Sequence, residues 1–169
     1  VRRDGFPMIL GCGIDLVEVA RFERELVRRR SEDHRELWRD AVWPDGVRRR
    51  PEGDRGLWRD VARRDFDNLD DVLTPSEIVC CQARRRPVVG CAAAFAAKEA
   101  CFKALGTGKT GAMSWHDVEI GREEGRYIVT LSGETAAVAQ GLGVDEIHLS
   151  LTHTRAYVVA LVVTSGVPQ

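Results

Sequence analysis

The sequence predicts a mixed α+β domain in which a mainly antiparallel sheet packs against helices. The first observation is a pair of strand patterns near the end of the chain, an apolar–polar alternation over about 147–152 and a continuous apolar run over 157–163. The second is a long helical pattern over about 88–105. The third is a length of 169 residues with 44% hydrophobic composition, which suits one well-buried core. We therefore expect a single domain over residues 1–169.

The N-terminal pattern predicts a strand followed by an amphipathic helix. The strand covers about 8–16, contains Gly11 and Gly13, and runs into Asp15. In the helix, over about 17–30, apolar residues recur at helical spacing. Its basic flank consists of Arg21, Arg24 and Arg28. Because two glutamates interleave with these arginines, an ordinary solvated helix face is an alternative to a binding surface.

The next stretch, about 31–73, has a different composition and is interpreted as a charged insertion. Arginines, acidic residues, prolines and glycines surround Trp38, Trp43 and Trp58. We expect the segment to lie away from the chemistry and to add contact to a partner protein or to another subunit. A structural role, in which the tryptophans hold a long loop against the core, is equally open.

Regular structure resumes at Thr74, where a threonine, a proline and Glu77 form the sequence signature of a capping box. A short helix to about residue 82 and the long helix that stops at Gly106 follow. Three further elements precede the two closing strands: hairpin strands at 117–120 and 127–131 and a small helix at 133–142. The predicted order is β-α-α-α-β-β-α-β-β.

Composition limits the classes of partner. The formal charge is −1, with 25 basic and 26 acidic residues, so no net field attracts nucleic acid or an anionic membrane. Arginine triplets at 28–30, 48–50 and 84–86 suggest a nucleic-acid surface as a competing interpretation, but adjacent acids oppose it. The N-terminal apolar run is too short to span a membrane, and we expect a cytoplasmic protein. Five cysteines without a CxxC pair indicate neither a disulfide framework nor a zinc site.

Two carboxylates and a group of lysines are the first candidates for chemistry. Asp15 lies at a strand end loosened by glycines, where a helix cap is the simpler interpretation. Glu99 falls on the apolar stripe of the long helix, although a surface pair with Lys103 at i+4 is an alternative. The three lysines of the chain, Lys98, Lys103 and Lys109, all lie close to Glu99 in sequence. Since lysine carries a compact charge suited to phosphate, this clustering favours phosphate binding over coincidence.

Two further positions complete the candidate set. Gly106-Thr107-Gly108 allows a backbone to approach phosphate, although Gly106 is also explained as a helix stop. His153 ends the first closing strand, where an isolated histidine is more often structural than functional. It becomes a phosphate contact if the other segments converge on it.

Three segments together resemble the motifs of holo-acyl-carrier-protein synthases, which are 4′-phosphopantetheinyl transferases. They are a G-x-D start with a following R-F over 13–22, an F-x-x-K-E-A-x-x-K-A-x-G-T-G centre over 95–108, and an S-L-T-H end over 150–153. The resemblance covers about residues 8–30 and 72–163 and implies the fold of that family. It also implies transfer of 4′-phosphopantetheine from coenzyme A to a carrier-protein serine, with release of adenosine 3′,5′-bisphosphate.

The resemblance implies roles for these residues. Asp15 and Glu99 would bind Mg²⁺ with the pyrophosphate of coenzyme A, and Glu99 and Lys103 would be catalytic. Substrate contacts would come from Lys98, Lys103, Gly106, Gly108 and His153. The base that accepts the serine proton stays open between Glu99 and a metal-bound water.

Partners follow from the same resemblance. Carrier proteins of this class are acidic, so the flank of Arg21, Arg24 and Arg28 would meet the carrier. A homotrimer is expected, and neither nucleic acid nor a membrane is expected as a partner. The alternative function is that of a catalytically degenerate family member that binds carriers or acts as a scaffold.

Overall fold

The computed structural model describes residues 7–28 and 69–167, with the side chains of 25–28 outside this description. Most of the predicted insertion, including its three tryptophans, and the last two residues of the first predicted helix lie outside the described residues. Residues 69–73, which we had assigned to the insertion, pack into the core through Val72 and Leu73. The predicted α+β class is confirmed.

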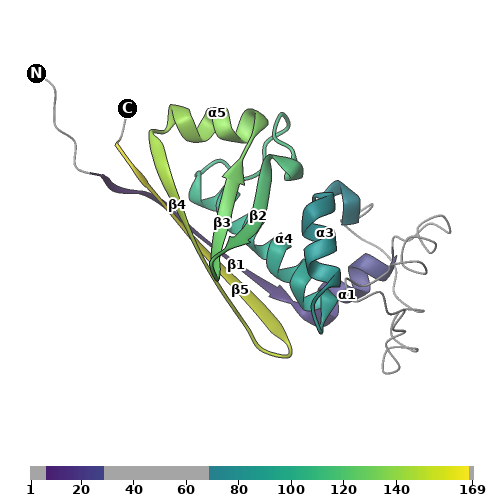
Figure 1. The fold of residues 1–169 in the computed structure, drawn as a ribbon. Coiled ribbons are helices and arrows are strands. Elements are labelled where there is room, and N and C mark those ends of the chain that lie inside the picture. Colours follow the sequence, from purple (N-terminus) through teal and green to yellow (C-terminus); the bar gives the residue numbers. More distant parts are fainter. Residues whose placement is uncertain (1–6, 29–68, 168–169) are drawn as a thin grey trace, which may run out of the picture.

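The elements follow the predicted order (Figure 1). They are β1 (Met8–Glu18), α1 (Val19–Arg28), the 3-10 turn η1 (Leu69–Asp71), α3 (Pro75–Gln82), α4 (Pro87–Ala104), the 3-10 turn η2 (Trp115–Asp117), β2 (Val118–Glu123), β3 (Arg126–Leu131), α5 (Gly133–Gly141), β4 (Val144–His153) and β5 (Tyr157–Gly166). The first strand continues two residues beyond the predicted end at 16. The reason is the ladder to β5, in which Val17 pairs with Val158 and Glu18 with Tyr157.

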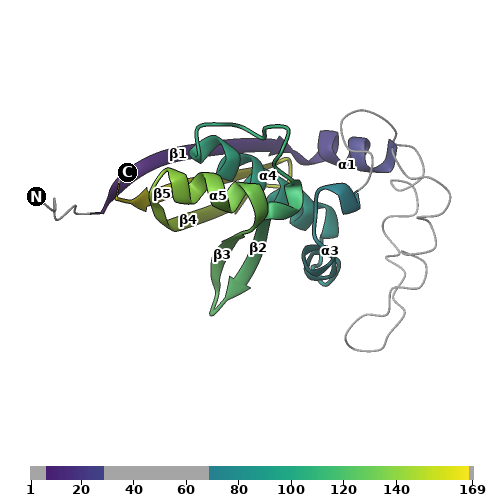
Figure 2. The same ribbon diagram turned by 90° about the horizontal axis from the view of Figure 1, so that it is seen from above.

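Two antiparallel sheets form the β part of the domain. Strands β1, β5 and β4 make a three-stranded sheet with β5 in the centre, and β2 and β3 make a separate hairpin. Helix α4 packs on one face of the larger sheet, between that sheet and the hairpin (Figure 2). Its neighbours explain why most of its side chains are buried.

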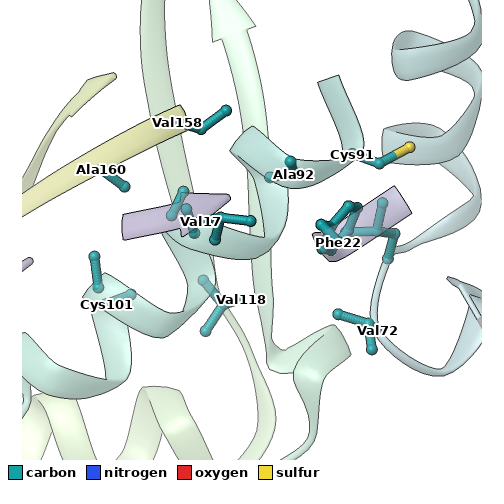
Figure 3. Close-up of a cluster of buried hydrophobic side chains, with 14 of the residues drawn as sticks. Val17, Phe22, Val72, Cys91, Ala92, Cys101, Val118, Val158 and Ala160 are labelled. Carbon is teal, nitrogen blue, oxygen red and sulfur yellow. The ribbon is translucent and has the colours of Figure 1, made fainter. Parts of the chain in front are cut away.

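The core is a cluster of small apolar side chains from the sheet, α4 and the hairpin. Val17, Cys101, Val118, Val158 and Ala160 gather around α4 in Figure 3. A row of aromatic rings extends the core toward α1 and η2. Neighbouring ring centroids in this row are 5.4–5.6 Å apart, and its members are Phe22, Phe95, Trp115 and Phe102. Burial of this apolar surface fixes α4 in place.

Strand β1 and helix α4 approach each other more closely than side chains would allow. A Cβ added to Gly11 would lie 1.9 Å from the Ala104 carbonyl oxygen. A Cβ added to Gly13 would lie 2.0 Å from the Ala100 carbonyl oxygen and 2.5 Å from the Ala104 nitrogen. These obstacles are backbone atoms, which cannot rotate away, so both positions require glycine.

A buried ion pair ties α3 to α4 and the hairpin. Lys98 Nζ lies 2.9 Å from Glu77 Oε2, and the side chains are 0% and 2% exposed. The ammonium also donates to the carbonyl oxygens of Trp115, at 3.0 Å, and Val118. The Glu77 carboxylate accepts from the Ile120 nitrogen at 2.7 Å and from the backbone nitrogen of its capping-box partner, Thr74. Both charges therefore have compensating partners, as buried charges require.

In the part of the chain that the structure describes, no helix combines the length and the apolar character needed to cross a bilayer.

We predict that Gly13→Ala destabilises the fold by about 1–3 kcal/mol or more, because the new methyl group overlaps α4 backbone atoms. Gly121→Ala is the matched control: it adds the same methyl group to a strand glycine whose nearest obstacle is 4.0 Å away. Urea unfolding of both variants measures the difference. Equal stability of the two would contradict the close approach.

We also predict that Lys98→Met destabilises the protein by about 3–5 kcal/mol, since it leaves the Glu77 carboxylate buried without its cation. The control is Lys109→Met, which removes an exposed ammonium from the same region of sequence. Thermal and urea unfolding give the comparison, and a loss of less than about 1 kcal/mol for Lys98→Met would argue against an essential pair.

Candidate active site

Asp15 and Lys103 meet where β1 passes over the C-terminal part of α4. Side chains alternate along a strand, so Asp15 faces α4 as Gly11 and Gly13 do. Lys103 Nζ lies 2.7 Å from Asp15 Oδ1 and donates to the Ile14 carbonyl oxygen at 3.2 Å. The carboxylate is 15% exposed and the ammonium side chain 46%, so the pair lies at the edge of the interface and is open to solvent.

Glu99 lies one helical turn before Lys103 and completes a small charged cluster. Its side chain is half-buried. Burial raises the pKa of Glu99 above its ordinary value, the negative charge of Asp15 raises it further, and the Lys103 ammonium opposes both effects. The Lys103 ammonium is therefore bonded to one carboxylate, Asp15, while its charge also acts on the other, Glu99.

This donor set fits a magnesium ion. The described residues hold no group of three or more His, Cys, Asp or Glu side chains arranged for a metal. Magnesium does not require one, because it takes one or two carboxylates and fills the remaining positions with water and phosphate oxygens. Asp15 and Glu99, whose negative charges act on one another's surroundings at this edge, offer two oxygen ligands of the kind that magnesium takes.

Gly106 and Gly108 form an exposed loop directly after α4. Both have positive φ angles, 74° and 61°, and a Cβ at either position would meet nothing within 4 Å. The Gly106 nitrogen donates to the Lys103 carbonyl oxygen at 3.0 Å, which ties the start of the loop to the last turn of the helix. The loop thus exposes backbone next to Lys103, as expected for a phosphate-facing segment.

His153 is exposed at the end of β4. It pairs across the sheet with Val158 of β5, which in turn pairs with Val17 of β1. Strand β5 therefore lies between His153 and the strand that carries Asp15. The structure places the histidine on the same sheet as the charged cluster but gives no direct contact to it.

Lys98 occupies a different position from the one we expected. We predicted a substrate contact, whereas its ammonium is fully buried and bonded to Glu77 and two backbone carbonyls. A phosphate has no access to it in this arrangement. The structure gives Lys98 a structural role, and of the two lysines predicted to contact substrate only Lys103 lies beside the carboxylates.

The basic flank of α1 is exposed where the structure describes it. Arg21 and Arg24 both lie on the surface, and Arg24 Nη2 is 3.9 Å from the Glu18 carboxylate. The side chain of Arg28 lies outside the described residues.

Arg86, a member of one of the arginine triplets in the sequence, donates to the Arg155 carbonyl oxygen at 3.4 Å. This contact brings two arginines that we had not assigned to the site next to the turn after His153.

Comparisons with known proteins identify relatives of this chain. Residues 57–162 match the model of the 4′-phosphopantetheinyl transferase superfamily. A holo-[acyl-carrier-protein] synthase from Koribacter versatilis is 41% identical over 157 residues, which cover 92% of this chain and 98% of that protein. A second, from Moorella thermoacetica, is 38% identical and covers 90% of this chain and 91% of its own length.

A solved structure shows the same fold. The holo-[acyl-carrier-protein] synthase of Helicobacter pylori, crystallised in complex with coenzyme A, superposes with a TM-score of 0.58 at 25% identity and covers 90% of this chain and 98% of its own. The family model, the sequence relatives and the solved structure all indicate the same family. The chain belongs to the holo-[acyl-carrier-protein] synthases of the 4′-phosphopantetheinyl transferase superfamily.

Proposed function

We propose that this protein transfers the 4′-phosphopantetheine group of coenzyme A to a serine of an acyl carrier protein and releases adenosine 3′,5′-bisphosphate. The observation that carries the proposal is the meeting of Asp15, Glu99 and Lys103 at one edge of the β1–α4 interface. The relatives named above are holo-[acyl-carrier-protein] synthases, and one was crystallised with coenzyme A. Two carboxylates that would hold magnesium, together with one ammonium, are the groups expected in a site that binds a pyrophosphate substrate.

Phosphoryl transfer depends mainly on positioning and on neutralising charge around phosphorus. Asp15 and Glu99 would hold magnesium, which when bound supplies positive charge to the pyrophosphate oxygens. Lys103 contributes a partly exposed ammonium at the same edge, and the backbone of Gly106 and Gly108 offers room for close approach of a phosphate. Glu99 and Lys103 are thus the side chains proposed to touch the reacting groups, with His153 as a further phosphate contact from β4.

The carrier serine is proposed to attack the phosphorus that bears the pantetheine arm. A bond forms between the serine oxygen and phosphorus, the bond to the bridging pyrophosphate oxygen breaks, and the bisphosphate leaves. The serine proton must leave in the same step. The raised pKa of Glu99 brings this carboxylate closer to the range in which a side chain accepts protons.

The proposed carrier surface begins at α1. Arg21 and Arg24 are exposed on this helix, which directly follows the strand that carries Asp15. An acidic carrier helix complements these charges. The charged segment predicted over 31–73 follows the same helix in sequence, and its last residues, 69–73, pack into the core. We propose that the rest of the segment adds contact to the carrier or to another subunit while remaining apart from the chemistry.

A homotrimer is the proposed assembly, and the sheet offers a surface for it. The face of the larger sheet opposite α4 exposes a set of large apolar side chains, namely Ile14, Leu16, Tyr157 and Leu161. Contiguous exposed apolar residues of this kind favour contact with a partner. Association between copies would bury them.

The function is tested by intact mass spectrometry of an apo acyl carrier protein incubated with the enzyme, coenzyme A and magnesium. Transfer adds the mass of one phosphopantetheine to the carrier, and a carrier whose acceptor serine is replaced by alanine stays unchanged. A carrier that binds the enzyme but never gains this mass would instead support the alternative of a degenerate, carrier-binding family member.

We predict that Asp15→Asn and Glu99→Gln each lower kcat by about 100-fold or more, because each removes a carboxylate that would hold magnesium against the pyrophosphate. Both substitutions keep the shape of the side chain and lie at the solvent-open edge, so the fold should be retained by circular dichroism. Glu123→Gln, at an exposed carboxylate on β2, is the matched control. Near-normal turnover of either folded variant at saturating magnesium would refute the metal assignment.

We further predict that Arg24→Glu raises the KM for the carrier about tenfold or more and leaves the KM for coenzyme A nearly unchanged. The reason is loss and reversal of a charge that should face an acidic partner. Arg122→Glu makes the same change on the exposed β2–β3 hairpin and serves as the control. Equal carrier KM values for the two variants would show that α1 is an ordinary solvated face.

A further inference from the structure

Two buried thiols, Cys81 and Cys91, lie at the contact between α3 and α4 and take no part in the site described above. Cys81 is 4% exposed in the last turn of α3, and Cys91 is 2% exposed in the second turn of α4. The two helices are joined by the short connection 83–86, which turns the chain back on itself. The two cysteines therefore lie on helices that contact each other.

Gly90 makes the approach of the two helices close. A Cβ at Gly90 would lie 3.3 Å from Cys81 Sγ and 3.4 Å from Cys81 Cα. The residue next to Cys91 in sequence thus packs directly against Cys81. Figure 3 shows the sulfur of Cys91 pointing away from Val17 and the centre of the core cluster.

The thiols interact with each other. A hydrogen-bonding interaction between the thiols lowers the pKa of Cys81, and the same interaction together with burial raises the pKa of Cys91. The Arg84 side chain lies beside Gly90, where a Cβ would be 3.0 Å from Arg84 Cδ, and its positive charge also lowers the pKa of Cys81. Because the thiolate is the reactive form, the nearby Arg84 favours Cys81 as the attacking thiol.

We propose that Cys81 and Cys91 form a redox-active dithiol that hydrogen peroxide converts to a disulfide between α3 and α4. The Cys81 sulfur attacks the peroxide, an S–O bond forms, the O–O bond breaks, and water leaves after protonation. The Cys91 sulfur then attacks the Cys81 sulfur, and an S–S bond replaces the S–O and S–H bonds with release of a second molecule of water. The two thiols lose two electrons in total, and the peroxide gains them.

The other cysteines provide controls within the same chain. Cys12 and Cys80 are exposed, so they report on accessibility alone. Cys101 is buried, and desolvation raises its pKa to about 12. It therefore shows how a buried thiol reacts with peroxide when its pKa is raised rather than lowered. If exposure alone decided the outcome, Cys80 and Cys12 would react first and Cys81 would not.

The test treats the native enzyme with hydrogen peroxide in a Cys12→Ser/Cys80→Ser background, then measures intact mass and maps peptides without reduction. The expected result is a loss of two hydrogen atoms per chain, a peptide that links Cys81 to Cys91, and reversal by dithiothreitol. Cys91→Ser in the same background should instead gain oxygen at Cys81, because the second thiol is missing.

The parent chain with all five cysteines gives a second measurement that does not depend on how the variants fold. In it the same linked peptide should form, while Cys101 remains open to alkylation after denaturation. The proposal is overturned if Cys81 and Cys91 both stay reduced while Cys80 is oxidised, or if the linked peptide joins a different pair.

Discussion

The close approach of β1 to α4 is the constraint on which the rest of the structure depends. Gly11 and Gly13 let the strand lie against the carbonyl oxygens of Ala100 and Ala104, at separations where a methyl group would overlap them. Asp15 is the next residue on the same face of the strand, so it reaches Lys103 directly. Strand geometry, helix geometry and two missing side chains together bring a carboxylate to the acidic and basic groups of α4.

The two lysines of α4 lie on different sides of the helix and have different surroundings. Lys98 and Lys103 are five residues apart, which places them about 140° apart around the helix axis. Lys98 points into the core and holds Glu77 of α3, whereas Lys103 points to the solvent-open edge beside Asp15. Glu99 and Lys103, separated by one turn, share that edge. The buried pair thereby fixes the rotation of the helix that presents the other two groups.

Sequence patterns anticipated the parts of the molecule that depend on local rules. The capping box at Thr74 and Glu77, the alternating strand predicted over about 147–152 and the stop of α4 at Gly106 follow from short-range physics. The structure contains each, with the strand extended to Val144–His153. The burial of Lys98 was not anticipated, because its partner Glu77 belongs to a different helix and the sequence does not show how α3 packs on α4. The position of His153 across β5 from Asp15 likewise depends on strand order, which no local pattern determines.

We propose that the glycine-lined crossing of β1 and α4 places Asp15 and Glu99 so that they share one divalent cation. A crystal structure of the protein with coenzyme A and Mn²⁺, with the anomalous signal used to locate the metal, would test this arrangement. The expected result is a single strong peak with oxygen atoms of Asp15, Glu99 and the pyrophosphate as ligands. A peak bound only by phosphate oxygens and water, with both carboxylates out of reach, would contradict it.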